Sequence, residues 1–353
     1  MRKGGVGLDS LDLRILREME LDGRQPVSGL ARRLGISRAY ASKRLHSLLD
    51  QKTTRITAFT NLLALGYRTM AVTGIRVSPG QLHAVADRLR AIPNVFSVVI
   101  AAGWQDIIVW TVFANPADLS GFLAKELGSI SGITSTETMM VIEWRASLPR
   151  VFSNERRKVF LSYPSSLHSM AWNNQQEEKA ALARQRDQEL DLSVDQLDLM
   201  ILSEMEQDGR QSLSALARKL HISRGNASAR LHRLLDKQIT RIIAFANPAN
   251  LGYPVFAMIG MRVSPQEINS VVDKVETLSN VYWVAKVAGR HDVIVGAVFA
   301  DLIELSRFLG RELGAIPGVL STETMIGLEL RKMSLAYLAS SYLRSIEKYQ
   351  QER

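Results

Sequence analysis

The chain has 353 residues, of which 46% are apolar and 22% are charged, with a formal net charge of +9 and no cysteine. This length predicts two or three domains with real cores, and the lack of cysteine excludes disulfides, thiolate metal sites and cysteine nucleophiles. The basic excess favours a polyanionic partner, with nucleic acid ahead of an anionic membrane surface. The N-terminal stretch "MRKGGVGLDS" has no apolar core, so we expect no signal peptide.

The first part of the chain predicts three short helices. The segment "LDLRILREMELDGRQ", from Leu11 to Gln25, has an apolar stripe at helical spacing, and "VSGLARRLGIS" predicts a second helix that ends at Gly35. Ser37 stands at the N-cap of a third helix, because its hydroxyl can accept an unpaired backbone N–H. That helix runs to about Asp50, and the β-branched stretch "TRITAF" after it predicts a strand.

The next part alternates between strands and helices in the order βαββαβ. Runs such as "SVVIAA" and "IIVWTVF" are too apolar for an exposed sheet, so one face must be covered by helices and the other by a partner. The longest apolar stretch is broken by Gln105 and Asp106, which indicates two strands around a turn and not a membrane span. The expected elements are strands at 70–77, 95–102, 107–114 and 133–144 and helices at 80–91 and 116–128.

The whole pattern returns 186 positions later, the separation of Leu11 from Leu197, and holds without a gap as far as Arg145. The line "ISRAYASKRLHSLLD" becomes "ISRGNASARLHRLLD", and "TRITAF" becomes "TRIIAF". About half of the aligned positions are identical. A repeat of this length indicates a duplicated two-domain protein and not a solenoid of small units. We refer to the two halves as copy one and copy two.

Two segments stand outside the repeat. Residues 146–192 contain Pro149, Pro164 and a long polar run, and we expect a linker there. In residues 332–353 apolar side chains recur at helical spacing, which predicts an amphipathic C-terminal helix that docks on another part of the protein. The stripe of this helix consists of Leu335, Leu338, Tyr342, Leu343 and Ile346.

Two short helices joined through "GIS" predict a helix-turn-helix, in which the first helix braces the second in the major groove of DNA. Ala41, Leu45 and Leu48 share the inner face of the second helix, which leaves its other face open. The nearby arginines suit phosphates. A structural bundle with a solvated basic face is the alternative, and the presence of two copies argues against it. The candidate DNA-binding residues are Arg38, Tyr40, Ser42, Lys43, Arg44, His46, Ser47, Arg224, Asn226, Ser228, Arg230, His232 and Arg233.

The stretch "LDLRILREMELDGRQPVSGLARRLGISRAYASKRLHSLLD" resembles the DNA-binding head of Lrp/AsnC-type transcriptional regulators. The "LGY" at 65–67 and the βαββαβ unit resemble the family's effector domain. The resemblance implies an α+β protein with two winged-helix-like helix-turn-helix domains, each followed by a ferredoxin-like domain that pairs through its sheet and binds effectors between subunits. We therefore expect DNA-binding heads at 8–60 and 193–246 and ferredoxin-like domains at 68–145 and 254–331.

Two departures from the family pattern fall at turns. The family often has a glycine between the recognition helix and the next strand, whereas "DQKTTRI" and "DKQITRI" have none. His221 stands where copy one has the turn residue Gly35. A histidine tolerates left-handed backbone at a higher cost than glycine, so we expect a costlier turn in copy two.

The sequences "AGWQD" at 102–106 and "AGRHD" at 288–292 match the family's Gly-x-x-Asp loop. The resemblance implies that such a loop can hold a small zwitterion, with backbone N–H groups for the carboxylate and the aspartate for the ammonium. A plain hairpin turn beside strand-edge threonines is an equally good interpretation, and Trp104 and Arg290 differ so much that binding can be restricted to one copy. The candidate effector-binding residues are Gly103, Asp106, Thr136, Thr138, Gly289, Asp292, Thr322 and Thr324.

The sequence contains no motif for metal binding, phosphate binding or nucleophilic catalysis. The six histidines form no metal-binding pair, and no phosphate-cradling glycine loop or nucleophile motif occurs. We therefore expect no catalytic residue, no metal and no cofactor.

The sequence as a whole predicts a cytoplasmic, sequence-specific transcriptional regulator that responds to an amino acid or related metabolite and does not contact membranes. It would bind double-stranded DNA as an intramolecular pseudo-dimer, with further homo-oligomers open. The exposed helix faces differ at Tyr40/Asn226, Lys43/Ala229 and Ser47/Arg233, and asparagine and arginine can read adenine and guanine, which predicts an imperfect palindrome.

Two alternatives stay open. One is a tetrapyrrole-pathway decarboxylase-like enzyme, because haem-pathway decarboxylases resemble these regulators in fold and fold alone does not decide function. The other is a nucleoid-architectural protein that binds DNA with little sequence preference. The basic heads and the missing acid/base set argue against the enzyme, and the polar recognition faces argue against the architectural protein.

Overall fold

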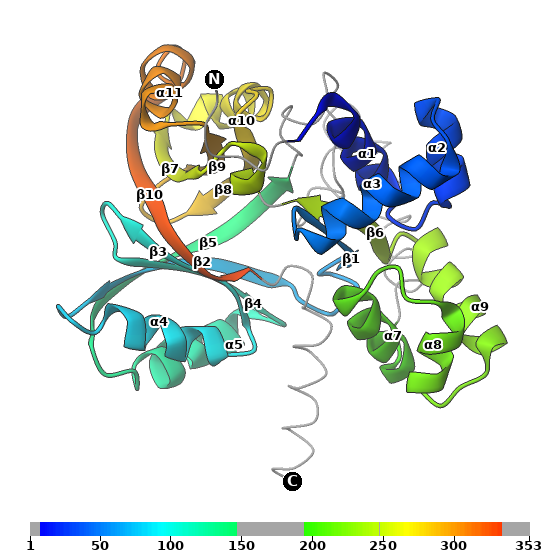
Figure 1. Ribbon diagram of the computed structural model, residues 1–353. Coiled ribbons are helices and arrows are strands. Elements are labelled where there is room, and N and C mark those ends of the chain that lie inside the picture. The colour runs from blue at the N-terminus through cyan, green and yellow to red at the C-terminus, as the bar shows by residue number, and fades with distance from the viewer. Residues whose placement is uncertain (1–7, 147–193, 247, 334–353) are drawn as a thin grey trace, which may run out of the picture.

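The computed structural model describes residues 8–146, 194–246 and 248–333 (Figure 1). The two helical heads lie on one side of the molecule, and the two sheet domains with their helices lie on the other. The expected linker falls almost wholly outside the described residues. So does the expected C-terminal helix, apart from residues 332–333, which belong to the last strand. Within the described ranges no helix has the length and apolar character needed to cross a membrane.

Each head consists of three helices whose starts follow the local sequence. Asp9 caps the first helix and forms a reciprocal capping box with Asp12, and the hydroxyl of Ser37 accepts the N–H of Tyr40 at 3.2 Å, as expected of an N-cap. The helices are α1 (Ser10–Leu21), α2 (Val27–Leu34) and α3 (Arg38–Asp50) in copy one, and α7 (Gln196–Gln207), α8 (Leu213–Lys219) and α9 (Arg224–Asp236) in copy two.

The turns that lack glycine adopt left-handed backbone with other residues. His221 has φ of 53°, close to the 68° of Gly35 at the corresponding turn. Lys52 and Gln238, which lie between the third helix of each head and the strand after it, also have φ of 53°. The missing glycines therefore leave the turn conformation in place but add steric cost.

A two-stranded sheet joins the two heads. Strand β1 (Thr54–Thr60) pairs antiparallel with β6 (Thr240–Ala246), and Thr57 lies opposite Ile243, its own counterpart in the repeat. Equivalent residues therefore face each other around a pseudo-twofold axis at this point. The sequence did not predict this pairing, because each strand alone is too short to show which edge it adds to.

Close backbone contacts reinforce the head pair. The N–H of Gly23 donates to the carbonyl of Ile242 at 2.7 Å, and the N–H of Gly209 donates to Ile56 at 3.0 Å. Arg24 reaches the carbonyl of Gly209 at 2.9 Å, and Arg210 reaches that of Gly23 at 3.1 Å. Burial lowers the pKa of both arginines, and the charge of Arg210 lowers that of Arg24 further. Two half-buried cations thus share one small interface and are held there by carbonyl oxygens.

The domain after the head of each copy, which we call its body, has the expected order βαββαβ, so the α+β fold class is confirmed. Both second helices continue into a π-helical turn that the sequence did not predict. Copy one contains β2 (Thr69–Val77), α4 (Leu82–Ala91), β3 (Val95–Ala102), β4 (Ile107–Phe113), α5 (Pro116–Gly121), η1 (Phe122–Leu127) and β5 (Ile133–Ala146). Copy two contains η2 (Pro248–Leu251), β7 (Val255–Val263), η3 (Pro265–Glu267), α10 (Ile268–Glu276), β8 (Val281–Ala288), β9 (Val293–Phe299), α11 (Leu302–Arg307), η4 (Phe308–Leu313) and β10 (Val319–Met333).

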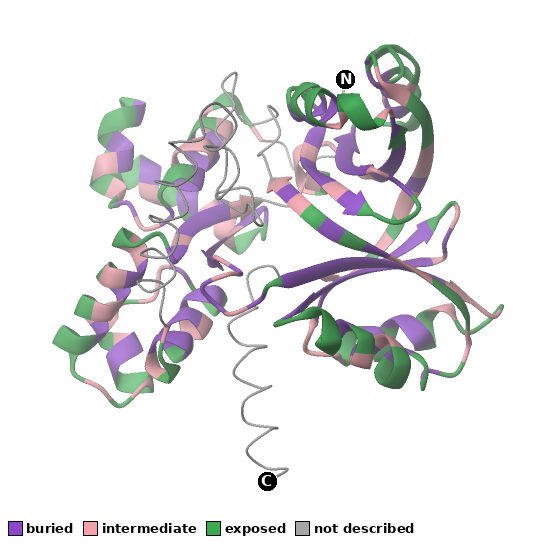
Figure 2. Cartoon of the chain, turned by 180° about the vertical axis from the view of Figure 1, so that it is seen from behind, coloured by how far each residue is buried: buried purple, intermediate pink, exposed green. Residues whose placement is uncertain are grey.

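The two four-stranded sheets close into one barrel of eight strands, in the order β10-β3-β4-β2-β5-β8-β9-β7. Each last strand crosses to the other copy: β5 pairs with β8, and β10 pairs with β3. We call these two ladders the first and the second seam. Closure leaves no free edge in this sheet, and the helices lie outside the barrel, where Figure 2 shows exposed outer faces over buried strands.

Hydrophobic packing divides the two bodies into layers. Val85, Leu89 and Phe122 belong to the core between the copy-one helices and the outer face of their sheet, and copy two has its own equivalent core. A third cluster runs from both heads into the barrel interior, where Trp110 and Trp283 meet edge to face at 4.8 Å.

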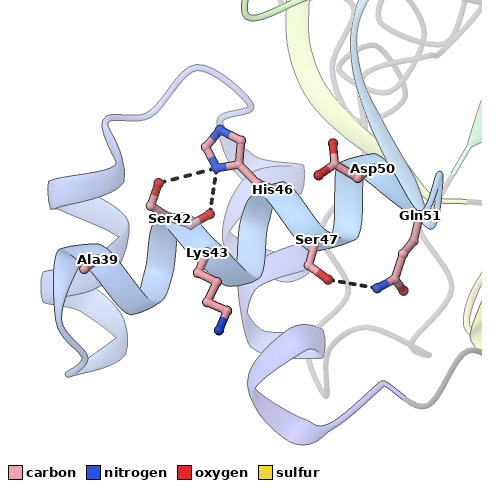
Figure 3. A pocket seen from close by; sticks show the side chains of 7 residues that line it. All are labelled: Ala39, Ser42, Lys43, His46, Ser47, Asp50 and Gln51. Atoms are coloured by element: carbon pink, nitrogen blue, oxygen red, sulfur yellow. Dashed lines mark hydrogen bonds between the residues drawn. The ribbon is translucent and has the colours of Figure 1, made fainter.

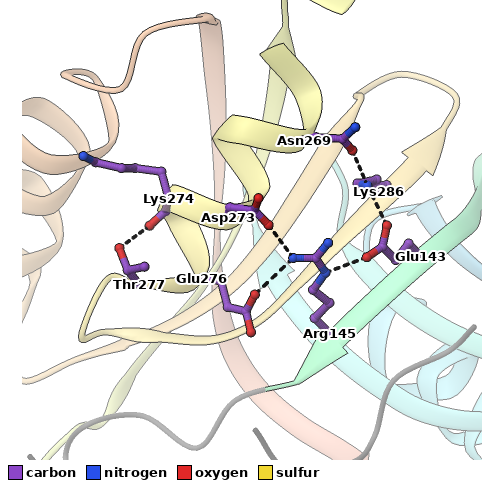
Figure 4. A network of polar contacts seen from close by, with 8 residues as sticks. All are labelled: Glu143, Arg145, Asn269, Asp273, Lys274, Glu276, Thr277 and Lys286. Carbon is purple, nitrogen blue, oxygen red and sulfur yellow. Dashed lines mark hydrogen bonds and ion pairs between the residues drawn. The ribbon is translucent and has the colours of Figure 1, made fainter. Parts of the chain in front are cut away.

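The first seam carries a polar network between the copies (Figure 4). Arg145, on β5, donates to Glu143 at 2.5 Å, to Asp273 at 2.7 Å and to Glu276 at 3.2 Å, and the last two lie on α10 of copy two. Lys286 lies 2.6 Å from Glu143. Burial opposes ionisation of Glu143, but the hydrogen bonds from Lys286 and Arg145 outweigh it and hold its pKa below the usual value.

The tight approach of Gly23 to the other head can be tested by adding one carbon. A Cβ at Gly23 would lie 2.8 Å from Cγ2 of Ile56 and 3.0 Å from the carbonyl oxygen of Ile242. We expect Gly23→Ala to lower the free energy of unfolding by roughly 1–3 kcal/mol through overpacking. Gly29→Ala, with nothing within 4 Å of the new carbon, should be neutral or stabilising by about 1 kcal/mol. Equal urea midpoints for the two variants would contradict this view of the head interface.

Candidate nucleic-acid interface and effector loops

The outer face of α3 is a shallow polar surface, as predicted (Figure 3). Ala41, Leu45 and Leu48 are buried against the head core. The residues that line the depression on the other side are Ala39, Ser42, Lys43, His46, Ser47, Asp50 and Gln51. The amphipathic pattern of the helix thus separates core from open face.

The histidine on each recognition helix is held along the helix. Nδ1 of His46 lies 2.7 Å from the carbonyl oxygen of Ser42, and Nδ1 of His232 lies 2.7 Å from that of Ser228. A carbonyl oxygen only accepts, so Nδ1 carries the proton in both rings. Nε2 of the neutral ring is therefore left to accept a hydrogen bond from a partner.

Three arginines proposed as DNA contacts form ion pairs within their own heads. Arg44 lies 2.6 Å from both Asp9 and Asp12 and ties α3 to the start of α1. In copy two Arg230 lies 2.6 Å from Asp195 and 2.9 Å from Asp198, and Arg233 also ion-pairs with Asp198. The side chain of Asp198 is only 1% exposed, so its charge requires these cations.

The remaining candidates differ between the two heads. Copy one exposes Arg38, Tyr40 and Lys43 along α3, and copy two exposes Arg224 and Asn226 on α9, with Ala229 in place of the lysine. Ser47 has a local partner, since its hydroxyl accepts the amide of Gln51 at 2.8 Å. Copy one therefore presents two cations on its recognition helix that form no ion pair within the described part of the chain, and copy two presents one.

The two Gly-x-x-Asp loops lie at the seams, each against a strand of the other copy. Gly103 has φ of 150°, and a Cβ there would lie 2.9 Å from the carbonyl oxygen of Thr324. Gly289 has φ of 151°, and its Cβ would lie 2.9 Å from Cγ of Met139. Glycine is required at both positions because the backbones of the two copies approach closely.

The aspartates of these loops anchor the loop itself. Asp106 accepts the N–H of Val77 at 3.0 Å and a guanidinium N–H of Arg76 at 2.9 Å. Asp292 accepts the N–H of Val263 at 2.9 Å and lies 3.4 Å from Arg262. Both carboxylates thus fasten the loop to the end of the neighbouring strand.

The threonines lie on the crossing strands beside the loops. Thr136 and Thr322 are exposed, and Thr138 and Thr324 are half-buried. Oγ1 of Thr138 lies 3.0 Å from Oγ1 of Thr73 within copy one.

Two glutamates between these threonines were missed by sequence reasoning. Glu137 and Glu323, the middle residues of the repeated "TET", contact the loops: Gln105 reaches Glu137 at 3.4 Å, and Arg290 and His291 reach Glu323 at 2.7 and 3.1 Å. The rings of Trp104 and His291 meet at 5.1 Å across the copies. The repetition of "TET" in both copies was the signal that could have found them. No cluster of three acidic or histidine side chains suited to a metal occurs in the described ranges.

Models of two known domain families match both copies of the repeat. A model of the Lrp/AsnC ligand-binding domain matches residues 70–147 and 256–337, and a model of the AsnC-type helix-turn-helix domain matches residues 8–49 and 194–235. The chain belongs to the Lrp/AsnC family. It is a tandem-duplicated member of this family of transcriptional regulators, with two heads and two ligand-binding domains in one chain.

Two sequence relatives of this Lrp/AsnC chain match a stretch about as long as one copy. It is 32% identical over 146 residues to an uncharacterised HTH-type transcriptional regulator of Pyrococcus abyssi, which covers 41% of this chain and 92% of that protein. It is 31% identical over 121 residues to the HTH-type transcriptional regulator Ptr1 of Methanocaldococcus jannaschii, or 34% of this chain and 82% of Ptr1. The crystal structure of the siroheme decarboxylase NirDL covers 97% of this chain and 99% of its own, with a TM-score of 0.61 and 14% identity. That likeness concerns the fold alone.

Proposed function

We propose that this protein binds double-stranded DNA in the cytoplasm with both heads of one chain, as an intramolecular pseudo-dimer, and regulates transcription in response to an amino acid or related metabolite. The observation that carries the proposal is the pair of open recognition faces on α3 and α9, joined by the β1–β6 sheet. Tethered heads do not depend on dilution for pairing, and one protein chain would then supply both half-site readers.

The free cations of copy one provide the first test. Replacing Arg38 and Lys43 by alanine should weaken DNA binding and flatten the slope of log K against log salt by ~1 for each lost phosphate contact. The matched control is Arg307→Ala with Arg311→Ala, which removes the same charge from exposed positions on the body. If the head and body variants bind DNA alike at every salt concentration, this head does not touch DNA.

The difference between the heads provides the second test. Selection of binding sites from random DNA should yield an imperfect palindrome, because Tyr40 and Lys43 face one half-site and Asn226 and Ala229 the other. Replacing Tyr40 by asparagine and Lys43 by alanine should move the selected site towards a symmetric repeat, with base discrimination of ~1–3 kcal/mol at the changed position. Ser47 is left unchanged in this swap, since its counterpart Arg233 is held by Asp198. A symmetric wild-type site would count against divided reading, and no selected site at all would favour the architectural alternative.

The loops provide the third test, a thermal-shift screen over amino acids and related metabolites, in which a ligand at a hundredfold excess over Kd stabilises by about 2.7 kcal/mol. Asp106→Ala and Asp292→Ala should each abolish the response of their own loop. Because each aspartate also anchors its own loop, the thermal shift of each variant is measured against the same variant without ligand. Thr136→Val changes a candidate effector residue and leaves both anchoring aspartates in place.

The same screen addresses the enzyme alternative, which the fold likeness to NirDL leaves open. An iron porphyrin is included, and we expect neither a thermal shift nor a change in its absorption spectrum. Tight porphyrin binding with no amino-acid response would turn the proposal towards the decarboxylase-like enzyme. Responses to amino acids that are identical in all loop variants would mean that the loops are only turns.

A further inference from the structure

A single guanidinium bridges the two copies at the point where the loops meet. Arg290 donates to Glu323 through Nε and Nη2, both at 2.7 Å, which is a bidentate contact. Its Nη1 lies 3.7 Å from Oε2 of Glu137, on the crossing strand of copy one. Glu137 and Glu323 are equivalent in the repeat, so one cation serves a symmetric pair of carboxylates.

The loop of copy one supplies no second cation. The residue equivalent to Arg290 is Trp104, whose ring lies against His291. His291 is 2% exposed, and burial lowers its pKa although Glu323 opposes this, so the ring is neutral near neutral pH. The hydrogen bond from Arg290 is the main cause that lowers the pKa of Glu323, which keeps that carboxylate charged.

Two buried polar atoms beside the glutamates have no hydrogen-bond partner. They are Oε1 of Gln105 and Nδ1 of His291, which occupy equivalent positions in the two loops. Oε1 is an acceptor, and Nδ1 is also an acceptor when Nε2 donates to Glu323. Both atoms belong to side chains that contact the glutamates, and the two carboxylates themselves match a planar cation that carries donors only.

We propose that Glu137 and Glu323 form a binding site for a guanidinium or amidinium cation between the copies, and that Arg290 is its built-in occupant. Arg290, a residue of copy two, fills a position that would otherwise accept a free organic cation. It thereby offsets one of the two negative charges of Glu137 and Glu323 without any effector. This proposal rests on the ion-pair geometry, and it does not require DNA binding or an amino-acid ligand.

Removing Arg290 should open the site to a free cation. In the full-length protein at low salt, Arg290→Ala should lower Tm by roughly 2–4 °C, and millimolar ethylguanidinium should restore most of that loss while leaving the wild type unchanged. Tetramethylammonium at equal ionic strength has no donors and should restore nothing. The double variant with Glu323→Gln should not respond to ethylguanidinium, and Arg311→Ala, which removes an exposed cation elsewhere on the body, should behave as wild type.

The opposite results would overturn the proposal. One is an Arg290→Ala variant whose Tm does not change with ethylguanidinium. The other is an equal rise of Tm in Arg290→Ala and in the double variant that also carries Glu323→Gln. If Arg290→Ala does not fold, Arg290→Lys keeps one charge without the bidentate fork, and its Tm should fall below that of the wild type and rise with ethylguanidinium. A lysine variant that matches the wild type in both measurements would show that charge alone suffices, and the guanidinium site would be rejected. None of these readouts involves DNA, so they can fail independently of the proposed regulator.

Discussion

Antiparallel strand pairing between the two copies is the constraint on which the rest of the structure depends. The ladders β1–β6, β5–β8 and β3–β10 all join strands of different copies. The β1–β6 ladder places Thr57 opposite its equivalent Ile243, whereas β5–β8 and β10–β3 are equivalent to each other: Met140 pairs with Ala288, and Ile326 pairs with Ala102. The heads are joined by the first ladder and the bodies by the other two. The closed barrel therefore takes strands from both halves of the chain.

Equivalent residues of the two copies have diverged in complementary ways. In copy one Trp110 lies opposite Ser97 in the ladder, and in copy two Trp283 lies opposite Gly296, so the large and small positions have exchanged. A Cβ on Gly296 would lie 2.3 Å from the indole of Trp283, which shows how closely the exchange is packed. A symmetric dimer would place the same residue at both equivalent positions. Fusion removes that restriction, and the Trp104/Arg290 difference at the loops is of the same kind.

Local signals in the sequence predicted most elements but not their partners. Caps such as Ser37, the helical stripes and the apolar strand runs act within a few residues, and the elements lie within a few residues of the expected ranges. The pairing of β1 with β6 and the contacts of Glu137 and Glu323 depend on residues far apart in the chain, which periodicity does not report. Arg44 and Arg230 show the same limit, because their ion pairs with Asp12 and Asp198 form only when the folded head brings distant residues together.

The buried aspartate of each head decides how much charge its recognition helix keeps for a partner. Asp12 is paired with Arg44, and the serine at position 47 adds no cation, so Arg38 and Lys43 remain on α3. Asp198 takes both Arg230 and Arg233, so the extra arginine of copy two adds nothing to the outer face of α9. Residue counts would therefore rank the two helices as equally basic, whereas within the described residues α3 keeps two cations without an ion pair and α9 keeps one. The difference in unpaired charge between α3 and α9 thus depends on which carboxylates hold the arginines, and not on the number of basic residues in each helix.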